Sequence, residues 1–148
     1  MHGIELNPAS VKSATQNAWL NGVKNVEFHQ GDASHFIAAV AKEGITPDIV
    51  VVDPPRQGLD PVFVNAMIGV KPPKIVYISC DPSTLARDVK LFVANGYALR
   101  RVQPVDMFCQ TAHVEDSLVA YFESDDERIN NSHSDQFDQN RPSDMYLR

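Results

Sequence analysis

Short apolar runs alternate with longer amphipathic segments between residues 1 and 123. The apolar runs predict strands at residues 2–6, 26–29, 48–52, 74–79, 97–104 and 117–122. Apolar residues at helical spacing predict helices at residues 8–21, 33–41, 61–70 and 82–95. The order β-α-β-α-β-α-β-α-β-β is typical of an α/β three-layer sandwich with a mostly parallel sheet. No helix separates the last two strands, so we expect them to be antiparallel.

Two of these segments also predict which side chains are buried. Phe36, Ile37 and Val40 recur at helical spacing, so we expect them to face the core. Residues 48–52 form an apolar run, which predicts a strand buried on both faces, as parallel strands are.

Charge divides the chain into two parts. The 148 residues carry 13 Lys and Arg against 19 Asp and Glu, a formal net charge of −6. Residues 124–148 hold six acidic residues and three arginines, a net charge of −3, and almost no apolar periodicity. We therefore predict one domain at residues 1–123 and a disordered acidic tail at residues 124–148. The domain has no basic excess, so nucleic-acid binding has to be argued from motifs.

Composition excludes several classes of protein. No apolar run approaches the roughly 18 residues of a transmembrane helix, and the first residues do not resemble a secretory signal. Cys80 and Cys109 alone cannot form a disulfide scaffold or a four-ligand zinc site, and we expect no metal. We expect a protein of the reducing cytoplasm.

Polar side chains follow four successive predicted strands. Glu5, Asp32, Asp53 and Cys80 each come at the end of a strand. In open α/β sheets ligands bind beyond the carboxyl ends of the strands, so these residues are candidates for a binding site. A single Asp in such a place, Asp32 for example, is equally explained as a loop or helix-capping residue.

Cys80 stands between a predicted strand and the start of a predicted helix. A helix N-terminus favours the thiolate, which is the nucleophilic form of cysteine. A buried structural cysteine is the alternative reading of that position. Nothing near Cys109 activates it, and we interpret Cys109 as structural. Glu115 comes just before the last predicted strand, which fixes its placement and makes it a candidate general base.

Three runs of residues, in this order, resemble the RNA uracil-5-methyltransferases. They are Asp53–Leu59 (DPPRQGL), Ser79–Asp88 (SCDPSTLARD) and Asp106–Glu115 (DMFCQTAHVE). The resemblance covers about residues 3–122. Members of this family methylate C5 of uridine in ribosomal or transfer RNA with S-adenosylmethionine.

The resemblance implies a class I methyltransferase fold and a role for each candidate residue. Cys80 matches the nucleophile that adds to C6 of uracil, and Glu115 matches the base that removes the C5 proton. Glu5 matches the acid that binds the cofactor ribose, Asp32 the residue near the adenine, and Asp53 the acid at the point of methyl transfer. The implied partner is RNA with a single-stranded or flipped uridine. We expect a monomer.

The chain departs from the family pattern at two positions. Asp81 stands where the family usually has Asn, and Cys109 where it usually has Pro. Neither change removes a catalytic group.

The family's first strand, its glycine-rich turn and its upstream RNA-binding portion find no counterpart in the sequence. We therefore expect a carboxy-terminal fragment, inactive alone, with an empty slot between the strands at Glu5 and Val52. Two alternatives stay open. One is a methyltransferase for another substrate, which Cys80 together with Glu115 argues against, and the other is a non-catalytic remnant.

Overall fold

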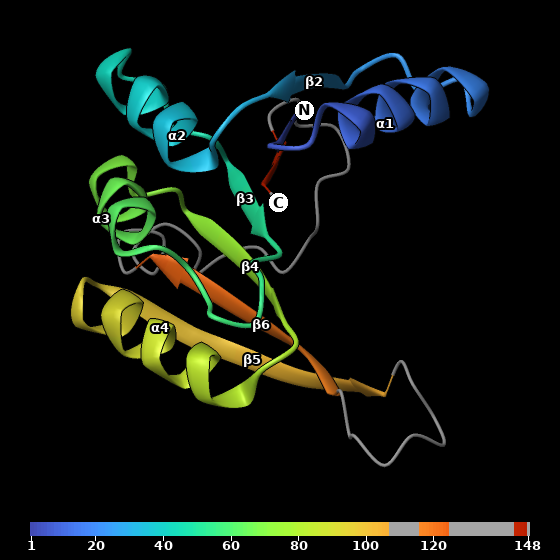
Figure 1. Cartoon of the computed structure of the whole chain (residues 1–148). Helices are drawn as coiled ribbons and strands as arrows, with labels where there is room; N and C mark the ends of the chain where they lie inside the picture. Colours follow the sequence, from blue (N-terminus) through green and yellow to red (C-terminus); the bar gives the residue numbers. More distant parts are fainter. Residues whose placement is uncertain (107–115, 125–143, 148) are drawn as a thin grey trace, which may run out of the picture.

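The computed structural model describes residues 1–106, 116–124 and 144–147 of the chain. These residues form seven strands and four helices (Figure 1). The elements are β1 His2–Glu5, α1 Pro8–Leu20, β2 Glu27–Gln30, α2 Ala33–Lys42, β3 Ile49–Val52, α3 Pro61–Val70, β4 Lys74–Ser79, α4 Pro82–Ala94, β5 Tyr97–Asp106, β6 Asp116–Ser124 and β7 Asp144–Leu147. The six predicted strands and four predicted helices are confirmed within a few residues, and β7 is additional.

All seven strands belong to one sheet, in the order β2-β1-β7-β3-β4-β6-β5. The five strands from β2 to β4 in that order are parallel to one another. β6 is antiparallel to both of its neighbours, β4 and β5. The expected antiparallel pairing of β5 and β6 is confirmed. β5 consequently runs in the same direction as β4, and its carboxyl end lies at the same edge of the sheet.

β7 lies where the sequence predicted an empty slot. It pairs in parallel with β1 on one side and with β3 on the other, so that Tyr146 stands between Gly3 and Val51. β1 and β3 do not pair with each other in the described sheet. Neighbouring strands lie about 4.8 Å apart, so a single strand fills the roughly 9.6 Å between β1 and β3.

The prediction of a disordered tail over residues 124–148 is therefore wrong for residues 144–147, and Ser124 ends β6. The four residues Asp-Met-Tyr-Leu are too few to stand out as a strand within a polar segment. They form a strand because β1 and β3, on either side, have backbone N–H and C=O groups that need hydrogen-bond partners. No local sequence pattern reveals this pairing. The rest of the predicted tail, residues 125–143 and Arg148, lies outside the described residues.

Each helix begins at a residue whose side chain accepts hydrogen bonds from backbone amides of the first turn. The N-cap residues are Asn7, Asp32, Asp60 and Asp81. Three helices have Pro in the first turn, where its missing N–H leaves no hydrogen bond unmade. These caps fix where each helix starts, close to the carboxyl end of the preceding strand.

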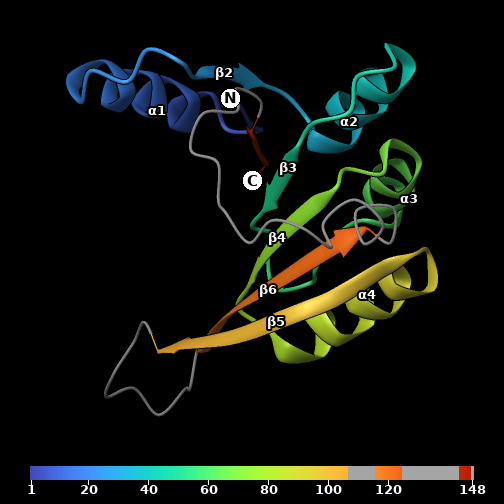
Figure 2. The same cartoon turned by 180° about the vertical axis from the view of Figure 1, so that it is seen from behind.

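Helices cover both faces of the sheet. α3 and α4 share one face, with α4 in front of β5 in Figure 1 and behind it in Figure 2. On that face Phe36 of α2 packs against the ring of His29, with centroids 5.6 Å apart. Phe28 is the next residue along β2 and therefore points to the other face, where it and Trp19 of α1 line a common hollow. The expected three-layer sandwich is confirmed.

The core lies mainly between the sheet and the face that carries α2, α3 and α4. Ile37 and Val40 are buried and Phe36 packs against the core, as predicted. In β3, Val50 and Val52 are buried, whereas Val51 is half-buried, so the predicted burial on both faces holds for one face only. The other face carries α1, which has no buried residue. Among the described residues, no helix is long and apolar enough to cross a membrane.

A buried carboxylate holds the loop after β3 against α4. Asp88 of α4 is fully buried, and its Oδ2 accepts hydrogen bonds from the Leu59 amide at 2.9 Å and the Tyr77 hydroxyl at 2.8 Å. Its Oδ1 accepts a charged hydrogen bond from Arg87 Nε at 2.8 Å. Burial and this carboxylate raise the pKa of Tyr77 above its usual range. Arg87 also donates to the carbonyl oxygen of Gln57 at 3.0 Å, so the second half of the loop is tied to α4 at two residues.

The chain approaches this carboxylate through a glycine. Gly58 has φ +79°, and a Cβ there would lie 2.6 Å from Arg87 Nη2 and 2.7 Å from Asp88 Oδ2. Any side chain at residue 58 would therefore meet both the strain of a left-handed backbone and a collision with the ion pair.

We expect Tyr146→Pro to destabilise the chain, because it removes one N–H from a strand that is paired on both sides. Leaving a backbone partner unpaired costs roughly 1–3 kcal/mol of unfolding free energy. Urea unfolding followed by circular dichroism measures the change. Tyr146→Val is the matched control, since it keeps the amide and a high strand propensity. An unchanged midpoint for Tyr146→Pro would show that β7 contributes nothing to the sheet.

We expect Gly58→Ala to lower the free energy of unfolding by roughly 1–3 kcal/mol, the usual cost of a forced left-handed residue. Gly69 is the matched control. It lies in α3 with nothing within 4 Å of an added Cβ, so Gly69→Ala should leave stability unchanged or raise it by about 0.5–1 kcal/mol. Equal effects of the two substitutions in thermal unfolding would contradict the packing of Gly58 against Asp88.

Candidate active site at the carboxyl edge of the sheet

The predicted site residues that the structure describes all lie at one edge of the sheet. Glu5 ends β1, Asp53 directly follows β3, and Cys80 directly follows β4. Asp32 follows β2 after one residue, Gly31. Because these strands are parallel, their carboxyl ends meet at the same edge, where α/β folds bind ligands. The loops that hold these candidate residues therefore share one side of the molecule.

A cavity of about 580 Å³ opens at this edge. That volume is within the usual range for small-molecule sites. It is formed between the end of β1, the start of α2, and the loop that connects β3 to α3. Its lining residues are Leu6, Gly31, Asp32, Ala33, Ser34, Val52, Asp53, Pro54, Pro55, Gln57, Gly58, Leu59, Asp60, Pro61, Phe63 and Arg87. Two of the predicted cofactor residues, Asp32 and Asp53, thus face one cavity.

Asp32 serves both the cavity and helix α2. Its Oδ1 accepts hydrogen bonds from the amides of Ser34 at 2.7 Å and His35 at 3.3 Å. Slight burial acts to raise the pKa of Asp32, but the two amide bonds outweigh it and hold the pKa below its usual range. The carboxylate therefore stays ionised near neutral pH. The side chain that caps α2 therefore also lines the cavity.

Glu5 lies beside the cavity without lining it. Its Oε1 accepts a hydrogen bond from the Asn7 amide at 2.7 Å, and Asn7 in turn caps α1. The neighbouring residue, Leu6, supplies an apolar wall of the cavity. In the structure Glu5 therefore stabilises the turn after β1 and lies next to the cavity, whereas the resemblance implied that it contacts the cofactor ribose.

Cys80 is half-buried at the junction of β4 and α4. Asp81 caps α4, and hydrogen bonds from the Ser83 hydroxyl and the Thr84 and Ser83 amides hold the pKa of Asp81 below its usual range. Ser79 Oγ accepts from the Asp81 amide at 3.1 Å and donates to the Asp81 carbonyl at 2.9 Å. The residues on both sides of the thiol are thus fixed by hydrogen bonds.

The turn at Cys80 is connected to the loop that lines the cavity. Thr84 Oγ1, in the first turn of α4, donates to the carbonyl oxygen of Arg56 at 3.1 Å. Cys80 itself is not among the lining residues. A hydrogen bond thus joins the helix turn that follows Cys80 to the loop whose other residues line the cavity.

Glu115 lies outside the described residues, but the residues around its loop are placed. Asp106 ends β5 and pairs with Asp116, the first residue of β6. Both stand at the carboxyl edge of the sheet, because β5 runs in the same direction as β4. Leu118, three residues after Glu115, pairs with Ser79, the residue before Cys80. The described residues on either side of 107–115 thus lie at the edge that carries Cys80.

Sequence reasoning missed the cluster of Asp88, Arg87, Tyr77 and Gly58 that supports this site. A signal for it exists in α4, where Leu85, Asp88 and Phe92 share the helical spacing of a buried stripe. A carboxylate in such a stripe is rarely buried unless it is paired, which points to a structural network. The partners of that network come from residues far along the chain and could not be named from the stripe.

Relatives at about half sequence identity are RNA methyltransferases. An uncharacterized RNA methyltransferase of Oceanobacillus iheyensis is 49% identical over 115 residues, which cover 78% of this chain and 25% of that protein. A second one, from Lactococcus lactis, is 49% identical over 122 residues, covering 82% and 26% respectively. The chain thus spans about a quarter of the length of the curated relatives it matches.

Solved structures agree with this relationship. A Pyrococcus abyssi tRNA (uracil-54, C5)-methyltransferase, crystallised with S-adenosyl-L-homocysteine, has a TM-score of 0.64 and 30% identity, covering 82% of this chain and 28% of that one. NSun6 of Pyrococcus horikoshii reaches a TM-score of 0.63 at 19% identity, covering 84% and 41%, which shows the fold alone. The sequence profile of the tRNA (uracil-5-)-methyltransferases matches residues 2–121. The chain therefore belongs to the tRNA (uracil-5-)-methyltransferase family and has the fold of the class I methyltransferases.

Proposed function

We propose that this chain is the catalytic portion of an enzyme that transfers a methyl group from S-adenosylmethionine to C5 of a uridine in RNA. The observation that carries the proposal is the position of Cys80. It lies just before α4, and the first turn of α4 is hydrogen-bonded to the loop that lines a cavity with Asp32 and Asp53. A nucleophilic thiol is needed to methylate a carbon of uracil and is not needed to methylate an amino group.

The cavity suits the cofactor. Its carboxylates, Asp32 and Asp53, are hydrogen-bond acceptors for amino and hydroxyl groups, and its apolar wall includes Leu6 and Phe63. A nucleoside with a charged amino-acid chain offers the matching donors and an apolar ring. We propose that Asp32 contacts the adenine end, that Asp53 lies at the methyl group, and that Glu5 accepts from the ribose hydroxyls after its bond to Asn7 is exchanged.

Cys80 supplies the activation that uracil needs. C5 of uracil is a poor nucleophile, and addition of the thiolate to C6 places the electron pair of the C5–C6 double bond on the ring as an enolate. When bound, S-adenosylmethionine supplies an electrophilic methyl group. C5 would form the new bond to this methyl carbon as the carbon–sulfur bond breaks, and the electron pair of the broken bond would stay on the sulfur of S-adenosylhomocysteine. The N-terminus of α4 favours the thiolate that begins this sequence.

Glu115 completes the reaction in this proposal. Its carboxylate takes the proton from C5, the electron pair of the C5–H bond restores the C5–C6 double bond, and the Cys80 thiolate leaves C6. The base and the nucleophile must approach the ring from opposite sides. The pairing of Leu118 with Ser79 supports this arrangement, because it holds the strand after Glu115 beside the strand before Cys80.

The partner in this proposal is RNA that presents a uridine outside its base stack, bound by a monomer in the reducing cytoplasm. The family resemblance places a glycine-rich turn and an RNA-binding portion outside the matched residues. We therefore propose that the 148-residue chain alone does not methylate RNA. Tests of catalysis accordingly use a chimera in which residues 2–121 replace the matching segment of the Lactococcus lactis relative.

In this chimera we expect RNA with 5-fluorouridine to form a covalent adduct, because fluorine at C5 blocks proton removal and traps the Cys80–C6 bond. Denaturing electrophoresis detects the adduct as a shifted protein band. Cys80→Ala should abolish it. Cys109→Ala is the matched control and should retain it. An adduct that persists in Cys80→Ala would refute the assignment of the nucleophile.

We expect Glu115→Gln in the same chimera to form the adduct with unmodified RNA and to release it slowly. Loss of a general base typically lowers a rate by roughly 10²–10⁴-fold. Single-turnover assays with tritiated cofactor measure methyl transfer and release separately. Glu43→Gln is the control, since Glu43 lies at the carboxyl end of α2, toward the opposite edge of the sheet. Turnover of Glu115→Gln at the unsubstituted rate would show that another group is the base.

A further inference from the structure

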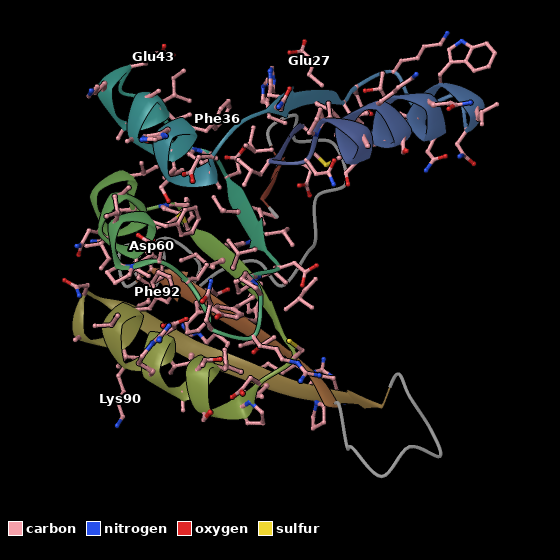
Figure 3. The ribbon with its side chains drawn as sticks, in the orientation of Figure 1. Glu27, Phe36, Glu43, Asp60, Lys90 and Phe92 are labelled. Atoms are coloured by element: carbon pink, nitrogen blue, oxygen red, sulfur yellow. The ribbon has the colours of Figure 1, made fainter. Side chains whose placement is uncertain are left out.

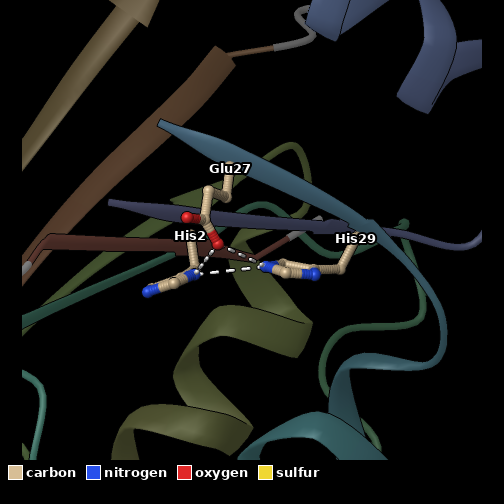
Figure 4. A group of neighbouring side chains, drawn as sticks. All are labelled: His2, Glu27 and His29. Atoms are coloured by element: carbon tan, nitrogen blue, oxygen red, sulfur yellow. Dashed lines mark hydrogen bonds and ion pairs between the residues drawn. The ribbon is translucent and has the colours of Figure 1, made fainter. Parts of the chain in front are cut away.

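Two histidines and a glutamate gather on β1 and β2, away from the cavity. His2 pairs with Glu27, and Ile4 pairs with His29, so the three side chains share one face of two parallel strands. Alternate residues of a strand point to the same side, and parallel pairing sets neighbouring residues opposite each other. His2 and Glu27 begin their strands, which places the cluster toward the amino edge of the sheet. The three side chains point toward one another (Figure 4).

The potential ligand atoms are already at metal-binding distances. His2 Nδ1 lies 3.2 Å from His29 Nε2, and Glu27 Oε2 lies 3.8 Å from each of them. Tetrahedral zinc with bonds of about 2.0–2.1 Å requires its ligands to stand roughly 3.3–3.4 Å apart. The nitrogen pair meets this requirement, and the carboxylate needs to move by only a few tenths of an ångström.

The surroundings hold the two rings in this arrangement. The rings of His2 and His29 are stacked with centroids 5.4 Å apart, and Phe36 of α2 packs against both, at 6.4 and 5.6 Å. The start of β1 is held too, because Glu27 donates its amide to the carbonyl of Met1 and the Met1 ammonium donates to Asn25. Ligands whose positions are fixed before binding lose little entropy when a metal arrives.

Solvent can reach the cluster. The side chains of His2, Glu27 and His29 are 48%, 72% and 40% exposed. The rim of the fold at Glu27 and Phe36 is seen in Figure 3. A metal ion therefore has an entry path, and a water molecule has room to complete a four-coordinate shell.

We propose that His2 Nδ1, His29 Nε2 and Glu27 Oε2 bind one Zn²⁺ ion, with water as the fourth ligand. Two imidazoles and a carboxylate are a donor set that zinc accepts in proteins. Without metal, one neutral imidazole donates to the other, and Glu27 attracts a ring only when that ring is protonated. When the ion binds, the donating ring carries its proton on the other ring nitrogen, so that both facing nitrogens offer lone pairs to the metal. The site lies toward the amino edge and is independent of the proposed methyl transfer.

Zinc binding is measured on the tag-free 148-residue chain by competition with a chromophoric chelator, and coordination by the spectrum of the Co²⁺ form. We expect one equivalent of zinc and the intense visible bands of four-coordinate cobalt. His29→Gln and Glu27→Gln should each weaken zinc binding by roughly 100-fold or more, since loss of supporting second-shell partners alone costs about 10–100-fold. His35→Gln is the matched control, because His35 is exposed on α2 and outside the cluster.

Glu27 and His35 are exposed and His29 is half-buried, and unchanged circular dichroism verifies that the variants fold. Several results would overturn the proposal. They are the absence of a zinc equivalent, a thiolate-to-cobalt charge-transfer band, six-coordinate cobalt, or a loss of affinity in His35→Gln equal to that in His29→Gln. Binding that is indifferent to Glu27→Gln would also overturn it, since it would assign the metal to the N-terminal amine and His2.

Discussion

The backbones of β1 and β3 require a strand between them, because they are too far apart to pair directly and an unpaired buried N–H or C=O is costly. β7 supplies that strand. Its presence sets the lateral spacing between the turn at Glu5 and the turn at Asp53, and so the width of the cavity that both turns flank. The geometry of the carboxyl edge therefore depends on backbone hydrogen bonds in the middle of the sheet. The side chains at that edge depend on this backbone arrangement for their positions.

A second constraint joins the two halves of the candidate site. The cavity is formed largely by the loop after β3, whereas Cys80 belongs to the turn after β4. Asp88 of α4 accepts hydrogen bonds from the Leu59 amide of that loop and from the hydroxyl of Tyr77, which belongs to β4, the strand that leads to Cys80. Its charge is balanced by Arg87 alongside. The position of the thiol relative to the cavity is thus set by a buried, fully paired carboxylate, which tolerates little change in its surroundings.

The elements that could be predicted from the sequence depend on local patterns. The features that could not be predicted depend on pairing between distant segments. The limits of β4 and α4 follow from an apolar run and from Asp81-Pro82, and the edge position of Asp53 and Cys80 follows from those limits. β7 could not be predicted because its four residues carry no pattern that distinguishes them from the polar residues before them. The bracing role of Glu5 and the approach of His2 to His29 depend on turn geometry and on strand register, which composition does not encode.

The place of β7 has a consequence for how the chain folds. The strand at the centre of the sheet comes after every other described strand in the sequence, and its contact of Met145 with His2 spans nearly the whole chain. Such a contact raises the contact order and delays completion of the sheet. During synthesis at about 5–20 residues per second, β1 and β3 emerge early and keep open edges for several seconds. Open edges recruit other strands, so the nascent chain is exposed to aggregation, or to a chaperone, until its last strand arrives.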